Sequence, residues 1–324
     1  MEDLDRDARA LWPDLAREAG LDPSGWTASR LALRQDARVA RVLLRMSRDG
    51  ADLVLKYEAR PERPEAFLAQ MARHSEIAAR FPSGAHMTVP PLLAIHPERQ
   101  ACLMGFVAGT HLSRLTEEAP ASDHPALLRR AGAWIAAFHQ SGFGERRPFR
   151  PKFQLDYLDR ILAEMDAGTR RVAQDSRFRA AAARYRALAP GFAGRQSVTA
   201  ALHGDLHMRN IVIGPQTAGL DFAEAGSAPV GHDLARLLVD YATLRADPKT
   251  IAPGDVLPAA ARDGFFAGYD LVGPDDPSVG LLLRHRILAD WWGLPATEAE
   301  RSPAQDRRLR RLMALAERSF ADPT

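Results

Sequence analysis

Residues 203–221 combine the side chains that are best suited to chemistry. The segment opens with the sequence HGDLHMRN, which ends at Asn210, and Asp221 follows two short apolar stretches, 211–213 and 218–220, that flank a turn containing Gly and Pro. If the two stretches pair as a hairpin, Asn210 and Asp221 lie side by side at its open end. The spacing therefore predicts that an amide and a carboxylate meet in space.

An amide oxygen and a carboxylate so placed suit Mg²⁺, which takes few protein ligands and completes its shell with phosphate and water. Asp205 stands in the loop before Asn210, where it is able to accept a proton from a substrate hydroxyl. A base, two metal-binding side chains and a separate cradle for phosphates are the parts that phosphoryl transfer requires. We therefore expect phosphoryl-transfer chemistry at this segment.

Lysine is scarce in this sequence, which makes each lysine informative. Lys and Arg together number 43, yet only Lys56, Lys152 and Lys249 are lysines. A lysine in such a background indicates a position that needs a compact ammonium group instead of a planar guanidinium. Lys56 ends the apolar run Val-Leu-Lys, whereas we interpret Lys152 and Lys249 as surface residues.

Periodicity divides the chain into a β-rich first part and a mostly helical second part. A boundary falls near residues 105–109, so we expect an N-terminal lobe of residues 1–105 and a C-terminal lobe of residues 106–324, an α+β organisation. The expected helices are 3–19, 64–81, 125–141, 153–168, 175–189, 233–244, 258–269, 277–292 and 303–320, and the expected strands are 30–33, 39–46, 51–57, 88–95, 100–104 and a pair within 211–220.

Composition excludes several classes of protein. A chain of 324 residues exceeds one compact core, and a net charge of +2 with interspersed acids and bases predicts no nucleic-acid surface. Cys102 is the only cysteine, so neither an intrachain disulfide nor a cysteine metal cage forms. The sequence has no run of 18 apolar residues and no apolar signal core at its start. We expect a soluble cytoplasmic protein that makes no membrane contact.

The motifs, taken in order, resemble the aminoglycoside phosphotransferase and choline-kinase-like family, which shares the protein-kinase-like fold. The resemblance covers residues 30–245. It is carried by Val54-Leu-Lys56, by Glu76 before Pro90, by Ala101-Cys-Leu-Met104-Gly-Phe106-Val107-Ala-Gly109, by His203-x-Asp205-x₄-Asn210 with Leu220-Asp221-Phe222, and by Pro229-Val-Gly-His-Asp233. One such motif alone is weak evidence, but five in the family's order are specific.

The resemblance implies an ATP- and Mg²⁺-dependent kinase for a small-molecule hydroxyl, with a role for each matched residue. Asp205 is the implied base, Asn210 and Asp221 the implied Mg²⁺ ligands. Lys56 is implied to hold the α- and β-phosphates with Glu76 as its helix partner, although Glu65 is a second candidate for that role. The family further implies adenine binding by the backbone of Met104, Phe106 and Val107, and structural support of the loop by His203 and Asp233.

Two segments depart from the family pattern. The loop 34–38 between the first two strands contains no glycine to let the backbone approach phosphates. Met208-Arg209 replaces a Pro-Gly pair, and Arg209 either pairs with an acid or touches an anionic group of the substrate. His207 is either a metal ligand or, as we favour, a loop histidine satisfied by a neighbouring carbonyl group.

Two other functions remain as alternatives. The missing glycines favour a catalytically inactive relative that binds nucleotide and acts through a partner. Gly204-Asp205-Leu-His207 also fits the opening of a metal-dependent phosphoesterase site, but no later segment supplies that site's remaining ligands. The arginine-rich C-terminal region argues against a polycationic acceptor such as an aminoglycoside and leaves sugars and amino alcohols as acceptors.

Overall fold

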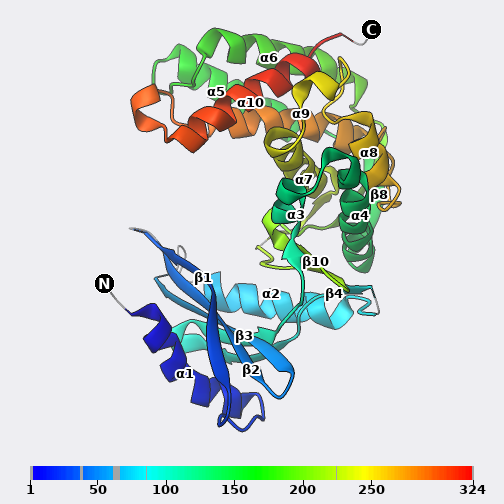
Figure 1. The fold of residues 1–324 in the computed structure, drawn as a ribbon. Coiled ribbons are helices and arrows are strands. Elements are labelled where there is room, and N and C mark those ends of the chain that lie inside the picture. Colours follow the sequence, from blue (N-terminus) through cyan, green and yellow to red (C-terminus); the bar gives the residue numbers. More distant parts are fainter. Residues whose placement is uncertain (1–2, 37–38, 61–65, 85, 224, 323–324) are drawn as a thin grey trace. The chain divides into compact units, whose positions relative to one another are not determined.

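The computed structural model describes residues 3–36, 39–60, 66–84, 86–223 and 225–322 (Figure 1). These residues form two compact units. The first consists of Met1–Gly109 and Val212–Glu224, and the second of Thr110–Ile211 and Ala225–Thr324. The boundary that we expected at residue 105 lies at 109. The expected C-terminal lobe is corrected in one respect, because residues 212–224 return to the first unit, where their strands pair.

The first unit contains a five-stranded antiparallel sheet in the order β1-β2-β3-β6-β5. Its elements are α1 (Leu4–Glu18), β1 (Thr27–Gln35), β2 (Ala40–Arg48), β3 (Ala51–Arg60), α2 (Phe67–Arg80), β4 (Met87–Thr88), β5 (Leu92–His96) and β6 (Ala101–Gly105). Asp49 and Gly50 join β2 to β3 with positive φ angles of 51° and 82°, as a tight hairpin requires.

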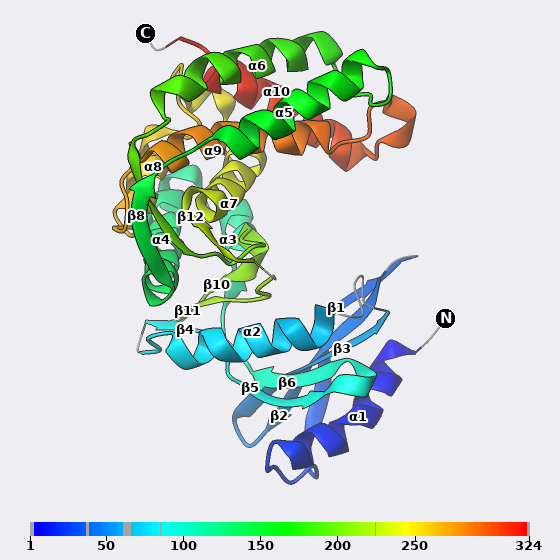
Figure 2. The same ribbon diagram turned by 180° about the vertical axis from the view of Figure 1, so that it is seen from behind.

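Alternate residues of β3 face opposite sides of this sheet. Leu55 packs into the apolar core beneath α1, whose own buried face is set by Leu4, Leu11 and Leu15. Lys56 lies on the other side, paired in register with Cys102, which packs against α2. The strand therefore presents Lys56 and every second residue from it to the face that α2 covers (Figure 2).

A second sheet in the first unit contains the predicted strand pair. In it β4 pairs with β11 (Thr217–Gly219), which pairs with β10 (Ile211–Ile213). The hairpin expected from the two apolar stretches is thus confirmed. Asn210 directly precedes its first strand along the chain, and Asp221 follows its second.

The second unit is mostly helical, as predicted, with a small sheet in the order β12-β9-β8 that the sequence analysis missed. The unit's elements are β7 (Thr110–His111), α3 (Leu112–Glu118), α4 (His124–Ser141), β8 (Phe143–Pro148), α5 (Lys152–Asp166), α6 (Asp175–Leu188), β9 (Gln196–Ala201), β12 (Ser227–Pro229), α7 (Gly231–Leu244), α8 (Ala259–Phe266), α9 (Pro277–Trp292) and α10 (Pro303–Ser319). Strand β9 leads directly into the loop that carries Asp205.

Close helix packing in this unit depends on glycine. A Cβ atom added to Gly132 of α4 would lie 2.5 Å from the carbonyl oxygen of Phe265 in α8, and one added to Gly268 would lie 2.0 Å from the carbonyl oxygen of Arg129. Since real Cβ atoms do not approach backbone so closely, only glycine permits this contact. No helix in the described part of the chain is long and apolar enough to cross a membrane.

Candidate active site

A buried carboxylate at the start of α7 holds the backbone of the loop that follows β9. Asp233 is 2% exposed, and its two oxygens accept hydrogen bonds from the backbone N–H groups of His203, at 2.6 Å, and Gly204, at 3.2 Å. His139 Nε2 of α4 lies 3.1 Å from the same carboxylate. Burial alone would raise the pKa of Asp233, but the hydrogen bond from His139 and the contacts with His203 outweigh it, and the pKa is lowered. The structure therefore places His203 and Asp233 in contact, in the arrangement expected of loop supports.

Asp205 projects from this loop with its side chain about one-third exposed. One carboxylate oxygen accepts a hydrogen bond from the guanidinium group of Arg236 in α7, and the other lies 3.7 Å from His207 Nε2. Arg236 was not among the residues predicted from the sequence. The sequence contains only a weak indication of this contact, because an arginine one turn after Asp233 reaches Asp205 only if α7 approaches the loop.

Asn210 is tied to the same loop. It is 5% exposed, and its Nδ2 atom donates a 2.8 Å hydrogen bond to the backbone carbonyl of Asp205. The bond fixes which way the amide faces, so Oδ1 is the side-chain atom that remains to bind a cation. The expected base and one expected metal ligand are thus positioned as a pair.

The second expected metal ligand lies in the first unit. Asp221 follows β11 with a φ angle of 57°, a left-handed conformation that few non-glycine residues adopt and that often marks functional sites. Its Oδ1 atom accepts a 3.2 Å hydrogen bond from Nζ of Lys56. The next residue, Phe222, packs edge-on against the ring of His74 in α2, with the ring centres 5.5 Å apart.

Lys56 is almost fully buried, and two carboxylates neutralise its charge. Besides Asp221, the carboxylate of Glu58 lies 3.0 Å from Nζ. Burial of the ammonium group would lower the pKa of Lys56, but the charges of Asp221 and Glu58 outweigh it and raise the pKa. Lys56 therefore stays protonated, as a phosphate-binding lysine must.

The expected pairing of Lys56 with Glu76 is wrong. Glu76 lies on the exposed side of α2, where its side chain is 67% exposed and pairs with Arg80 at 3.0 Å. The inward position of the helix belongs to His74, which is 4% exposed and whose Nε2 lies 2.7 Å from the carbonyl oxygen of Pro90. The other candidate, Glu65, lies outside the described residues.

Glu58 makes the ion pair with Lys56 that we expected from the helix glutamate. It follows Lys56 by two residues in β3, so both side chains point to the same face of the sheet. Its side chain is 12% exposed, and Arg41, opposite it in β2, lies 3.8 Å away. Strand alternation was the signal that could have identified Glu58 from the sequence.

The expected adenine-binding segment lies where β6 ends. Met104 is the penultimate residue of that strand and packs beside the cluster of Phe67, Met71 and Cys102. Gly105, which follows it, still pairs with Leu53 of β3. Phe106 donates its N–H to the carbonyl of Asp52 at 3.3 Å and carries the guanidinium group of Arg45 4.5 Å above its ring.

Val107 lies in the segment that follows the strand, two residues before Gly109. Residues 37 and 38 of the glycine-free loop 34–38 lie outside the described residues, whereas Asp36 accepts the N–H of Val39 at 2.8 Å. The roles of Met104, Phe106 and Val107 in nucleotide binding therefore stay predictions.

The two undecided loop residues have different surroundings from those we favoured. His207 Nδ1 accepts the backbone N–H of Arg209 at 3.2 Å and so caps a short turn, instead of donating to a carbonyl group. Burial lowers the pKa of His207 against the opposing charge of Asp205. Arg209 is exposed and makes no ion pair with any described residue, so pairing with an acid, one of its two expected roles, is not seen.

Solved structures share this fold at low sequence identity. The APH(2")-IIia enzyme, in complex with GDP and kanamycin, has a TM-score of 0.53 and 14% identity, over 89% of this chain and 91% of that one. Spectinomycin phosphotransferase APH(9)-Ia, in complex with ADP and spectinomycin, has a TM-score of 0.50 and 11% identity, over 90% and 92%. Plasmodium vivax ethanolamine kinase has the same TM-score and identity, over 90% of this chain and 82% of that one. At these identities the likeness shows the fold alone.

No curated protein matches the chain significantly in sequence. The sequence model of the phosphotransferase enzyme family, APH, matches residues 21–282, which is the greater part of the chain. That match includes the residues described above, from Lys56 to Asp233. The chain therefore belongs to the phosphotransferase enzyme family and is a phosphotransferase with the protein-kinase-like α+β fold.

Proposed function

We propose that this phosphotransferase moves the γ-phosphoryl group of ATP, bound with Mg²⁺, to a hydroxyl group of a small molecule. The observation that carries the proposal is the fixed pair of Asp205 and Asn210, held on a loop whose backbone is anchored by a buried carboxylate. Structures with the same fold bind ADP with spectinomycin, or GDP with kanamycin, which supports a nucleotide and a hydroxyl-bearing acceptor for this chain. Since ATP is abundant in the cytoplasm, we place the reaction there.

The donor atoms fit Mg²⁺. Asn210 offers an amide oxygen because its nitrogen is engaged, and Asp221 offers a carboxylate that a protonated lysine already holds in place. Hard oxygen donors of this kind, few in number, are typical of magnesium sites that share their ion with substrate phosphates. The ion would neutralise charge on the transferred phosphoryl group.

Each of the remaining residues then has a physical task. Asp205 accepts a hydrogen bond from the acceptor hydroxyl and orients it for attack, and Arg236 holds the carboxylate in one rotamer. Lys56 binds the α- and β-phosphates, and Glu58 keeps its ammonium group directed. The backbone that follows Met104 binds adenine.

The acceptor is a sugar, an amino alcohol or a similar metabolite. A guanidinium group stands beside Asp205, which disfavours an acceptor with several ammonium groups near the reacting hydroxyl because like charges repel. Plasmodium vivax ethanolamine kinase shares this fold, so an amino alcohol belongs in the first screen.

The test is an ATP-consumption screen of sugars, amino alcohols and aminoglycosides, with Asp205→Asn as the blank. We expect one acceptor class to raise ATP consumption and the substitution to abolish that increase, by ~10²–10⁴-fold. A thermal-shift titration with ATP and Mg²⁺ identifies the alternative, an inactive nucleotide-binding relative, because that protein would bind Mg-ATP and consume none. Protein that neither binds Mg-ATP nor responds to Asp205→Asn would refute the proposal.

A further inference from the structure

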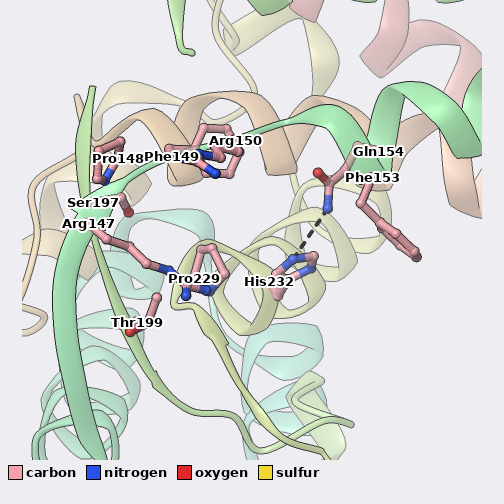
Figure 3. A pocket seen from close by; sticks show the side chains of 10 residues that line it. All are labelled: Arg147, Pro148, Phe149, Arg150, Phe153, Gln154, Ser197, Thr199, Pro229 and His232. Carbon is pink, nitrogen blue, oxygen red and sulfur yellow. Dashed lines mark hydrogen bonds between the residues drawn. The ribbon is translucent and has the colours of Figure 1, made fainter. Parts of the chain in front are cut away.

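A cavity of about 480 Å³ lies within the second unit, apart from the loop that carries Asp205. It is enclosed by β8 and β9, by the segment that joins β8 to α5, and by the first turns of α5 and α7 (Figure 3). None of the residues that line it belongs to the loop 203–210. Small-molecule sites have volumes of roughly 300–1,000 Å³, so the cavity is large enough to hold a ligand.

The cavity has a positive lining. Arg147 and Arg150 both border it, and its lining residues include neither Asp nor Glu. Arg150 makes no ion pair with any described residue. Arg147 lies 3.5 Å from Glu145, but both side chains are more than half exposed, so this pair is weak and easily exchanged for a ligand.

Two helix ends add to the positive potential. Helices α5 and α7 begin at the cavity, and neither has a capping side chain at its N-cap residue, although the Ser278 hydroxyl accepts the N–H of Gly231, the first residue of α7. The backbone N–H groups there carry a partial positive charge that favours an anion. Asp276, whose carboxylate accepts a hydrogen bond from Ser197 of the cavity lining, is already engaged because it also caps α9.

The remaining lining combines apolar side chains with a pair of hydrogen-bonding groups, Gln154 and His232, and with the hydroxyl residues Ser197 and Thr199. Phe149 and Phe153 border the cavity, and Phe153 is 72% exposed, an unusual exposure for a phenylalanine. Gln154 is 4% exposed, and its amide nitrogen lies 3.5 Å from Nε2 of His232 (Figure 3). At 3.5 Å that contact is long for a hydrogen bond, so both groups retain capacity for a ligand.

We propose that this cavity is a binding site for a small organic anion, one with a flat apolar ring and a single carboxylate, sulfonate or phosphate group. The anionic group lies between Arg147 and Arg150, where guanidinium groups bind oxyanions in two-point fashion. The ring lies against Phe149 and Phe153. The site is independent of the phosphoryl transfer proposed above, because binding requires neither nucleotide nor Asp205.

The probe for this site is 8-anilinonaphthalene-1-sulfonate, a fluorescent aromatic anion, titrated into the full chain without nucleotide. We expect binding of one probe per chain at this site, weakened at least about tenfold by Arg147→Ala with Arg150→Ala, since each removes a charge-assisted contact. Arg146→Ala is the matched control, because Arg146 neighbours Arg147 on β8 but does not line the cavity. N-phenyl-1-naphthylamine, which lacks the sulfonate, serves as the neutral probe.

Each outcome decides the proposal. The proposal is supported if the double variant loses one bound probe while binding to Arg146→Ala is unchanged. The neutral probe must also bind more weakly than the sulfonate. The proposal is overturned if the double variant binds the probe as well as the unmodified chain does, or if Arg146→Ala weakens binding equally. It is also overturned if the neutral probe binds equally well, or if the unmodified chain binds no probe. Phe153→Ala provides a second variant whose exposed position leaves folding intact, and it too should weaken binding.

Discussion

Replacing Glu58 with glutamine tests whether a strand residue supplies the partner of Lys56. The substitution keeps the size of the side chain and removes one of the two carboxylates around the ammonium group, the one 3.0 Å away. Asp221, at 3.2 Å, then remains as the other partner. We expect Lys56 to move toward Asp221, so that both residues are displaced from the positions in which they serve phosphates and metal.

The size of the effect follows from the distance. Two unit charges 3.0 Å apart attract by about 5 kcal/mol at an effective dielectric constant of 20. Most of this is offset, because Asp221 still neutralises Lys56 and glutamine still accepts a hydrogen bond. A net loss of roughly 1.4–2.7 kcal/mol remains, which corresponds to about a 10- to 100-fold decrease in kcat/KM for ATP.

The assay compares Glu58→Gln with Glu76→Gln by initial rates at varied ATP, with thermal melts to verify folding. Glu76 sits in an exposed ion pair, so its substitution should change kcat/KM less than about twofold. The pKa of Lys56 should also be lower in Glu58→Gln than in the unmodified chain, because one of the charges that raise it is lost. Equal effects of the two substitutions, or an unaltered Glu58→Gln enzyme, would refute the reasoning.

Three further predictions concern buried groups. Burial raises the pKa of the Cys102 thiol to about 12, so the native protein at pH 8 should react with a disulfide reagent ~10³-fold more slowly than a free thiol. The unfolded protein should react completely, and rapid labelling of the native protein would contradict this. Burial lowers the pKa of His285 to about 4, below the unfolded value near 6.5, so the unfolded state binds more protons between these values and the free energy of unfolding should fall by roughly 3 kcal/mol from pH 6.5 to 4. His285→Gln should lessen that slope in denaturant titrations, and an unchanged slope would show that other groups cause it. Gly132→Ala should destabilise the second unit by about 1–3 kcal/mol because its Cβ meets the backbone of α8; melts equal to the unmodified chain would rule out the close contact.

The sequence was most informative about elements with a strong local pattern. The helices predicted at 125–141 and 277–292 match α4 and α9 closely, since both are rich in apolar residues that become buried, in α9 on most sides of its first half. The sheet β12-β9-β8 was missed because its strands are short and come from distant parts of the chain. Strand β8, FGERRP, is exposed throughout and lacks the alternation that identifies a half-buried strand.

The candidate site was predictable where position along the chain determines position in space. Asp205 and Asn210 share one loop, so their association depends on few long-range contacts. Partners that arrive from other elements were not predictable in the same way. Arg236 reaches Asp205 only through the packing of α7, and Glu76 was assigned by resemblance although the rotation of α2 directs it to solvent.

The loop that carries Asp205 tolerates its unusual Met208-Arg209 pair because backbone contacts set its shape. Asp233 accepts two backbone N–H groups at the start of the loop, and the amide of Asn210 holds the carbonyl of Asp205 near its end. Met208 contributes no chemistry; its side chain is fully buried, with Sδ 3.7 Å from the hydroxyl of Thr116, and packs as a flexible apolar residue does. Arg209 points outward and is not needed for the turn. The geometry of the loop therefore depends on Asp233 more than on Met208 and Arg209, so we expect substitutions of these two residues to leave the position of Asp205 unchanged.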